Sequence, residues 1–351
     1  MRHPQESQSS TPLPECIRVS TTTPDSVTGW KRWRYRLEAI GVQTLANLAP
    51  VFPRRFLRQI GAGAGWLAYY AVPSVRQIAR ANLDMVYGTT VPACEKARIA
   101  RASCQNFVAT LLTFFWSKRL NRQTLTDIAE IDPAGLQLVR DLQAQQRPII
   151  FITLHFGDWE LLGLASGLLD IPMTIPTRTM RNTAVEAVFA RMRALTGHRM
   201  IPRRHAAGKM LKALQRRECI ALLVDQHVPV TLGGIWCKFF GVPALTSPVV
   251  AQFALHSGAA IVGSVAYPLP DGRLRITYGP EIVAPRTGDK ATDIQNLTQL
   301  CLDFCEHVIR EQPEHWLWSY KRWKHRPQAE LGVFPQYSRH LKSAGGPPPA
   351  T

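Results

Sequence analysis

The sequence predicts an α/β fold with a mostly parallel central sheet flanked by helices, preceded by a helical N-terminal portion that faces a membrane. From about residue 148, short β-branched runs alternate with helical patterns of about 10–15 residues, as in parallel sheets joined by helices. Hydrophobic residues form 46% of the 351 residues, which excludes a disordered chain. Lys and Arg number 42 against 25 Asp and Glu, and the resulting net charge of +17 favours anionic partners.

The composition divides the chain into four parts. Residues 1–28 are rich in Ser, Thr and Pro and lack the apolar core of a signal peptide, so we expect a disordered tail on a protein that is not exported. A helical membrane-associating region is expected over 29–120, an α/β catalytic domain over 121–327 and a flexible tail over 328–351. The seven cysteines are an odd number without paired spacing, which predicts thiols rather than disulfides.

Two N-terminal stretches raise the question of membrane contact. Residues 59–75 carry no charge, follow three arginines and include three aromatic rings, but they are shorter than a typical span of about 20 residues. An interfacial segment and a buried helix of the globular body are both compatible with this pattern. Residues 30–36 (WKRWRYR) interleave aromatic and basic side chains, as an interfacial element or a solvated helix end would. The next expected helical region, 76–120, has a break near 88–92.

The remaining elements follow from apolar periodicity and from the positions of Gly and Pro. The uncharged stretch 239–270 is interrupted by prolines and a glycine, so it predicts a buried helix followed by a buried strand rather than a membrane span. The expected strands are 148–154, 173–177, 199–203, 219–225, 260–267 and 273–279, and the expected helices are 158–169, 182–195, 206–217, 247–257 and 289–311.

The most informative motif is HFGDWE (155–160), which directly follows the buried strand 148–154. Ligands of open α/β sheets bind at the carboxyl ends of the strands. Gly157 permits a tight turn, and Asp158 can cap the helix that begins there. The motif therefore places a histidine at the expected position of a binding site.

The same motif holds the elements of general base catalysis. The imidazole of His155 can remove a proton from a hydroxyl near neutral pH. A carboxylate on its other ring nitrogen would fix the tautomer, and Glu160 in the first helical turn is the candidate. The alternative is a structural histidine at a strand end, with Glu160 merely complementing the helix dipole.

Other catalytic signatures do not occur in the sequence. There is no G-x-S-x-G motif and no Walker A loop, and GAGAG (61–65) lacks the context of a dinucleotide-binding loop. Cys301 and Cys305 lie one helical turn apart without His or Cys partners, so we expect core thiols rather than zinc ligands. No cofactor and no metal ion are expected.

Several motifs occur in one order along the chain: IARANL (78–83), HFGDWE (155–160), LLVDQ (222–226), KFFGVPALTSP (238–248) and PEHWLWSYKRWKHRP (313–327). Together they resemble the bacterial lipid A biosynthesis acyltransferases of the lauroyl or myristoyl type. These enzymes lie within the lysophospholipid and glycerolipid acyltransferase superfamily, whose signature is H-x4-D/E. The resemblance extends from about residue 40 to 327.

The resemblance implies an acyltransferase at the cytoplasmic face of the bacterial inner membrane. It would move a fatty acyl chain from an acyl carrier protein thioester to a hydroxyl of a lipid A precursor or related glycolipid, with His155 as general base and Glu160 orienting it. Other implied acceptors are a lysophospholipid or an amino-acid lipid. Its partners would be the carrier protein, the glycolipid and the membrane surface, which are all anionic, whereas no nucleic acid is expected.

The resemblance also implies substrate contacts outside the histidine motif. Arg178, Arg193 and Asp225 fall on the family's basic and acidic positions, and Arg191 is the alternative to Arg193. We expect the guanidinium groups to contact phosphate or other anionic oxygens. Where the family commonly has Asn, this chain has Asp158, which changes the local charge.

A basic segment near the C-terminus leaves a different class of function open. KRWKHR (321–326) would suit a non-catalytic protein that binds a membrane or nucleic acid, although no nucleic-acid-binding module is recognisable. The neighbouring Trp316, Trp318 and Trp323 predict an interfacial location for this segment.

Overall fold

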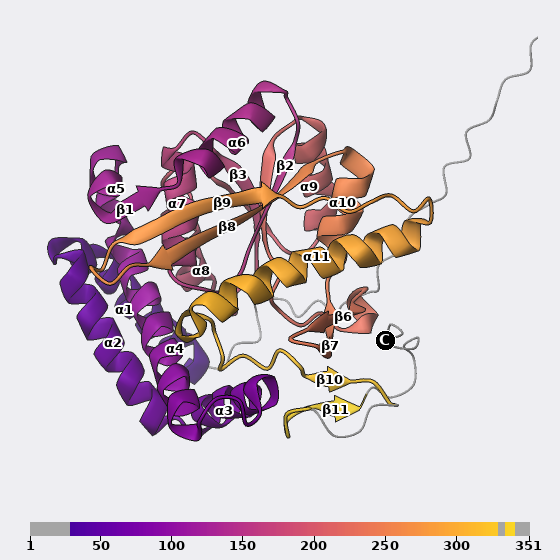
Figure 1. Cartoon of the computed structure of the whole chain (residues 1–351). Coiled ribbons are helices and arrows are strands. Elements are labelled where there is room, and N and C mark those ends of the chain that lie inside the picture. The colour runs from indigo at the N-terminus through magenta and orange to yellow at the C-terminus, as the bar shows by residue number, and fades with distance from the viewer. Residues whose placement is uncertain (1–28, 329–333, 341–351) are drawn as a thin grey trace, which may run out of the picture.

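A computed structural model describes residues 29–328 and 334–340 of the chain. The expected tail 1–28, and the expected C-terminal tail except for residue 328 and residues 334–340, lie outside these described residues. In Figure 1 a central sheet is covered by helices on both faces, and the N-terminal helices pack together beside and below one end of it. The predicted fold class of an α/β sheet flanked by helices is confirmed.

The sheet has seven strands in the spatial order β1-β9-β8-β2-β5-β3-β4. The five strands from β8 to β4 run parallel, whereas β9 pairs antiparallel with β8, and β1 pairs parallel with β9. Their bounds are β1 Ala129–Ile131, β2 Ile149–Thr153, β3 Met173–Thr177, β4 Arg199–Pro202, β5 Cys219–Leu223, β8 Ala260–Pro268 and β9 Leu274–Glu281.

Helices cover the two faces of this sheet because successive residues of a strand point to opposite sides. Ile150 and Ile152 of β2 belong to a buried cluster with α9, α10 and α11, whereas Ile149 and Phe151 pack with α6 and α7. The helices that follow the N-terminal region are α5 Arg122–Ile128, α6 Pro133–Ala144, α7 Trp159–Leu168, α8 Thr183–Arg193, α9 Ala206–Gln215, α10 Val249–Ser257 and α11 Lys290–Glu311.

The six strands and five helices expected from residue 148 onwards are all present, with ends that differ by a few residues. A hairpin of β6 (Ile235–Phe239) and β7 (Val242–Thr246) was not expected, and its two-residue turn has positive φ at Phe240 and Gly241. The three-residue β1 and the two-residue strands β10 (His325–Arg326) and β11 (Arg339–His340) were not expected either. Such short strands carry too little alternation to be recognised from sequence.

Four helices form the N-terminal region: α1 Gly29–Leu48, α2 Arg54–Ala71, α3 Pro73–Tyr87 and α4 Ala93–Phe114. The glycines of GAGAG explain the close packing of α2 on α4. A Cβ on Gly61 would lie 2.5 Å from the Cα of Ala109, and one on Gly65 would lie 2.5 Å from the Cα of Gln105. The motif therefore serves helix packing, which agrees with its exclusion as a nucleotide-binding loop.

Helix α2 carries exposed apolar side chains away from α4, and α1 and the connection between the two helices carry further ones. The exposed large hydrophobic residues from α1 to the residue after α2 are Trp30, Trp33, Leu37, Ile40, Leu48, Val51, Phe52, Phe56, Ile60, Trp66, Leu67, Tyr70 and Val72. We call this set the outer apolar face. One side of the helix in 59–75 is buried in the body, as the buried-helix alternative expects, and the other side is exposed. The interfacial alternative stays a prediction. Within the described residues, no helix is both long enough and apolar enough to cross a bilayer.

Candidate active site

The candidate site begins in the loop that joins β2 to α7. Gly157 in this loop has a φ of 56°, and a Cβ there would overlap the carbonyl oxygen of Ala266, so only glycine fits. Asp158 caps α7, because its Oδ1 accepts a hydrogen bond from the backbone N–H of Leu161 at 3.2 Å. The expected tight turn and helix cap are confirmed, and they place His155 at the carboxyl edge of the sheet.

A segment distant in sequence fixes the backbone of this loop. Residues 315–317 run beside it, and the N–H of Gly157 donates to the carbonyl of His315 at 3.0 Å. The N–H of Leu317 donates to the carbonyl of His155 at 3.2 Å. Two hydrogen bonds therefore hold the histidine loop to a segment about 160 residues further along the chain.

Helix α4 supports the same loop from the other side. The amide of Asn106 and the hydroxyl of Thr110 donate to the carbonyl of Gly157 at 3.1 and 2.9 Å, and all three groups are buried. A buried carbonyl that accepts two hydrogen bonds has both lone pairs satisfied. These bonds therefore fix the backbone of the turn at Gly157.

The carboxylate that contacts the imidazole belongs to Asp225, just after β5. His155 Nδ1 lies 2.9 Å from Asp225 Oδ1, and the backbone N–H of His155 donates to Oδ2 at 3.0 Å. Trp316 Nε1 also donates to Oδ2, at 2.9 Å. Strand register explains the pairing, because the offset of 70 residues that pairs Ile149 with Cys219 continues past the strand ends to His155 and Asp225.

The pair is electrostatically coupled. Burial lowers the pKa of His155, but the charge and hydrogen bond of Asp225 outweigh burial, so the pKa lies above its ordinary value. Burial raises the pKa of Asp225, but the charge and hydrogen bond of His155, with the N–H of Trp316, bring it below its ordinary value. Asp225 therefore stays ionised, while the side chain of His155 keeps 19% of its surface exposed.

Glu160 occupies a different position from the one expected. Its carboxylate forms a two-pronged ion pair with Arg193 of α8, at 2.9 and 2.5 Å, and only 8% of the Glu160 side chain is exposed. The expectation that Glu160 bonds to the ring of His155 is thus corrected, since Asp225 holds that nitrogen. The charge of Glu160 nevertheless raises the pKa of His155, and the charge of Arg193 lowers it, so both groups act on the imidazole.

Asp158 forms a second buried ion pair, with Arg54 at the start of α2. Arg54 Nη2 lies 3.0 Å from Asp158 Oδ2, and the two side chains are only 7% and 1% exposed. Arg54 also donates to the carbonyl of Gly272 at 3.0 Å. The additional charge of Asp158, noted as a departure from the family pattern, is therefore neutralised by an arginine from the N-terminal region.

The remaining predicted arginines are not brought to the imidazole. Arg178 is exposed in the loop after β3. Arg191 is also exposed, and its Nη2 donates to Oε1 of Gln43 on α1 at 2.9 Å. Of the two arginines considered on α8, Arg193 is thus the one that faces the site through Glu160.

Two side chains near Nε2 of His155 were given no role in the sequence analysis. Gln226 Nε2 lies 3.4 Å from His155 Nε2, and the centroid of the Trp159 indole lies 5.4 Å from that of the imidazole. Both belong to motifs quoted from the sequence, HFGDWE and LLVDQ, so their positions follow once β2 and β5 are known to be adjacent.

The tryptophans near the C-terminus are interior residues, which corrects their expected interfacial location. Trp316 is 1% exposed, and Trp318 and Trp323 are fully buried. Arg322 of the basic segment is also fully buried, donating to the carbonyl of Leu245 at 2.7 Å and the hydroxyl of Thr246 at 2.6 Å. The segment is therefore partly core, and less of it is available to bind nucleic acid.

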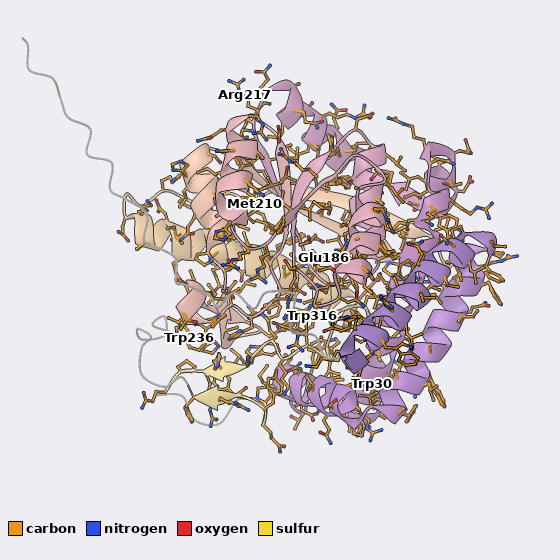
Figure 2. All side chains as sticks on the ribbon, turned by 180° about the vertical axis from the view of Figure 1, so that it is seen from behind. Trp30, Glu186, Met210, Arg217, Trp236 and Trp316 are labelled. Carbon is orange, nitrogen blue, oxygen red and sulfur yellow. The ribbon has the colours of Figure 1, made fainter. Side chains whose placement is uncertain are left out.

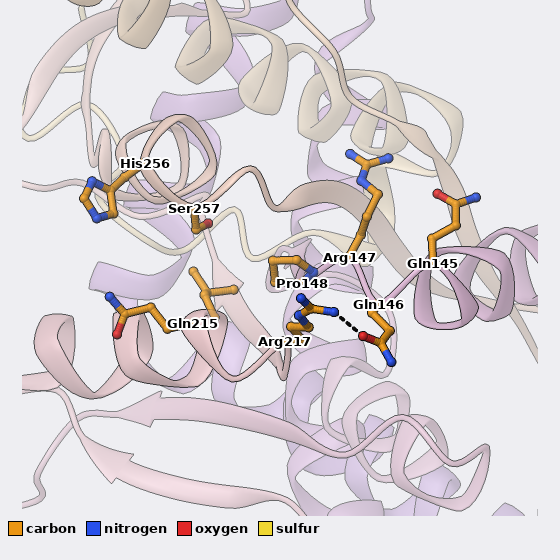
Figure 3. A pocket seen from close by; sticks show the side chains of 9 residues that line it. Gln145, Gln146, Arg147, Pro148, Gln215, Arg217, His256 and Ser257 are labelled. Atoms are coloured by element: carbon orange, nitrogen blue, oxygen red, sulfur yellow. Dashed lines mark hydrogen bonds between the residues drawn. The ribbon is translucent and has the colours of Figure 1, made fainter.

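The opposite edge of the sheet has a different character. A depression of about 470 Å³ lies at the amino ends of β2 and β5 and is lined by glutamines, arginines and His256. Figure 3 shows the side chains that line it. Figure 2 shows Arg217 of this depression and Trp316 of the site well separated along the strands.

Within 29–328 and 334–340, no group of three or more His, Cys, Asp or Glu side chains could hold a metal ion.

Comparisons with known proteins match nearly the whole chain. The family model described as bacterial lipid A biosynthesis acyltransferase matches residues 30–325. The chain is 25% identical over 317 residues to a lipid A biosynthesis lauroyltransferase of Escherichia coli K12, covering 88% of this chain and 98% of that protein. It is also 25% identical over 281 residues to a lipid A biosynthesis palmitoleoyltransferase of the same strain, covering 78% and 87%. A lipid A biosynthesis acyltransferase of Shigella flexneri matches to the same extent.

Proposed function

The chain belongs to the bacterial lipid A biosynthesis acyltransferase family, and we propose that it moves a fatty acyl chain from an acyl carrier protein thioester to a hydroxyl of a lipid A precursor or related glycolipid. The observation that carries this proposal is the contact of His155 Nδ1 with the ionised, buried Asp225. With Nδ1–H bonded to a carboxylate, Nε2 is the unprotonated nitrogen that can accept a proton, with the amide of Gln226 beside it at 3.4 Å.

The reaction follows from this tautomer. His155 Nε2 takes the proton of the acceptor hydroxyl while its oxygen attacks the thioester carbonyl carbon, and a tetrahedral intermediate forms. The carbon–sulfur bond then breaks, and the imidazolium returns the proton to the departing thiolate. The products are the ester of the glycolipid and the free thiol of the carrier. Asp225 stabilises the imidazolium during the intermediate without itself taking the proton.

Glu160 and Arg193 form the second part of the proposed machinery. The charge of Glu160 stabilises the imidazolium at longer range, and Arg193 prevents an uncompensated buried carboxylate beside it. Burial lowers the pKa of Arg193, but its bond to Glu160 raises it further, so this guanidinium stays charged. We assign the exposed Arg178, at the same edge of the sheet, to the anionic groups of the substrates.

We further propose that the outer apolar face rests on the cytoplasmic leaflet of the inner membrane. Its aromatic side chains lie on helices that also carry basic residues, which suits an anionic interface. The net charge of +17 favours the same surface and an acidic carrier protein. A peripheral position would let a glycolipid hydroxyl reach His155 without leaving the bilayer.

The test is an acyl-transfer assay with the purified full chain, acylated carrier protein and a deacylated lipid A precursor, read by mass spectrometry. We expect His155→Ala to reduce transfer by about 10²–10⁴-fold. His256→Ala is the matched control, because this exposed histidine lies at the other edge of the sheet. Full transfer by His155→Ala would refute the assignment of the base.

The acceptor is tested in the same assay. A lysophospholipid or an amino-acid lipid is supplied in place of the lipid A precursor. If either were acylated in preference to the precursor, the proposed acceptor would be wrong. Lipid profiling of a deletion strain should show lipid A lacking one acyl chain.

A further inference from the structure

Apart from His155 itself, Trp316 is the aromatic residue of the described part of the chain whose side chain hydrogen-bonds to the carboxylate of Asp225. It lies in a buried aromatic cluster with Phe239, Phe240, Trp318 and Trp323. Packing would be served equally well by any large ring in this cluster. The indole, however, directs its N–H at Asp225 Oδ2 at 2.9 Å, which a hydrocarbon ring could not do.

We propose that Trp316 is a positioning residue for acyl transfer, whose indole N–H fixes Asp225 so that its Oδ1 meets His155 Nδ1. The proposal depends on the proposed function, because it assumes that His155 is the base.

The geometry of Asp225 shows why a second donor matters. A carboxylate can rotate about its χ2 torsion with little restriction. Here Oδ2 accepts two hydrogen bonds, from the backbone N–H of His155 and from the indole of Trp316, and Oδ1 is left to the imidazole. Two donors from different directions fix the plane of the carboxylate, and the plane determines where Oδ1 lies.

The backbone that carries Trp316 is itself attached to the histidine loop. The two segments pair as a short antiparallel bridge between Phe156 and Trp316. The hydroxyl of Ser103 on α4 donates to the carbonyl of Trp316. The indole and the imidazole therefore belong to one rigid unit, and the position of the indole is set independently of Asp225.

The contact also has an electrostatic consequence with a definite sign. An N–H donor stabilises the carboxylate charge and thereby weakens its attraction for the imidazolium. Without the donor, Asp225 would attract the proton of His155 more strongly, and the pKa of His155 would rise. The other charged or titratable groups around the pair are Glu160 on α7, Arg193 on α8, Cys305 on α11, and Tyr320 and Arg322 after α11.

Trp318 offers a matched control. It belongs to the same cluster, with its ring centroid 4.7 Å from that of Trp316, and it is fully buried. Its Nε1 donates to the carbonyl of Pro313 at 2.6 Å instead of to Asp225. Trp318→Phe therefore removes one indole N–H and part of the packing, as Trp316→Phe does, but leaves the carboxylate contact intact.

The experiment measures the pKa of His155 by NMR of the ¹⁵N-labelled full chain, with the signal assigned by comparison with His155→Ala. The pH dependence of the transfer rate is measured on the same variants. In Trp316→Phe we expect the pKa of His155 and the acidic limb of the rate profile to rise by about half a pH unit. We expect kcat to fall about tenfold with little change in KM. Trp318→Phe should move neither the pKa nor the limb.

An unchanged pKa of His155 in Trp316→Phe, or an equal shift in Trp318→Phe, would overturn the proposal. A lowered pKa in Trp316→Phe alone would show that Oδ1 of Asp225 has moved away from Nδ1, which the proposed positioning role also entails. If Trp316→Phe does not fold, Trp316→His supplies the test, because its Nε2 can donate from nearly the same place as the indole nitrogen. The pKa of His155 should then not rise, and a rise would contradict the proposal. The NMR measurement needs no turnover, so its result stands even if His155→Ala shows that the proposed function is wrong.

Discussion

The carboxyl edge of the sheet and the outer apolar face hold their side chains in opposite ways. At the edge, two pairs of ionisable groups are largely enclosed: His155 with Asp225, and Arg54 with Asp158. On the outer apolar face, aromatic and aliphatic side chains such as Trp30 are exposed on helices whose other side is packed. Large exposed apolar patches of this kind mark surfaces that bind a partner or a membrane.

The difference teaches where each kind of change should act. A buried ion removed from its partner leaves an uncompensated charge, so changes at the edge should affect rate and folding. A side chain on the outer apolar face makes few contacts within the molecule, so its replacement should change the free energy of unfolding little. It should instead weaken association with a membrane. Changes at the sheet edge should therefore give larger effects on transfer and folding than changes on the outer apolar face.

The largest effect is expected for the carboxylate that orients the base. Asp225→Asn should reduce acyl transfer by about 10³–10⁴-fold, because an amide can present an N–H to Nδ1 and favour the wrong tautomer. Asp141→Asn is the control, since Asp141 is exposed on α6. Steady-state rates and thermal unfolding are measured together, and a variant that is folded and fully active would remove Asp225 from the mechanism.

The next effect concerns the ion pair that joins α2 to the histidine loop. Arg54→Ala should lower the free energy of unfolding by about 3 kcal/mol, because it removes the ion-pair partner of the buried Asp158 and leaves only the longer-range charge of Arg58. The double variant Arg54→Ala/Asp158→Asn should recover part of this loss, since a neutral amide still caps the helix. Denaturant unfolding measures both, and no recovery in the double variant would contradict the electrostatic explanation. Arg216→Ala breaks an exposed pair and should leave the unfolding midpoint unchanged.

The pH profile should reflect the coupling of His155 to Asp225. Transfer needs the neutral imidazole, and the pKa of His155 lies above 6.5. The acidic limb of the rate profile should therefore have its midpoint above pH 6.5. At pH values below this midpoint, the rate should fall about tenfold per pH unit. The sign for stability is opposite. Protonated His155 stabilises the fold below pH 6.5, and this contribution is lost as the pH rises through the folded-state pKa. A limb at or below pH 6.5 in single-turnover rates would contradict the coupling.

The smallest effect on the enzyme itself is expected on the outer apolar face. Trp66→Ser and Leu67→Ser should weaken binding to vesicles of phosphatidylethanolamine and phosphatidylglycerol by about tenfold each. Transfer to detergent-dispersed acceptor should stay unchanged. Leu232→Ser is the control, because this leucine is equally exposed but lies outside the N-terminal helices. Equal weakening by Leu232→Ser in a vesicle sedimentation assay would show that the binding surface lies elsewhere.

Sequence reasoning predicted the sheet because each central strand is a short β-branched run between helical patterns, as β2 and β5 illustrate. It could not choose between Glu160 and Asp225 as the partner of His155, because that choice depends on β2 and β5 being neighbours in register. Once adjacency is known, the equal distance of His155 and Asp225 from the starts of their strands identifies the pair. The Glu160–Arg193 pair depends on how α8 packs, which no local pattern encodes.

The tryptophans near the C-terminus were misplaced for a related reason. Trp316 and Trp318 lie beside basic residues in the sequence, and composition alone therefore suggested a water–lipid boundary. In the fold, the chain returns beneath the sheet after α11, and their rings close the core. Burial by a distant segment cannot be inferred from neighbours along the chain.

The pairing of residues 315–317 with the histidine loop has a consequence for biosynthesis. His155 and Asp225 leave the ribosome well before the indole that completes their arrangement. A nascent chain halted within α11 would therefore carry the base and its carboxylate without the donor that fixes them. On the proposed mechanism, competence for transfer would arrive late in translation, after most of the described fold has emerged.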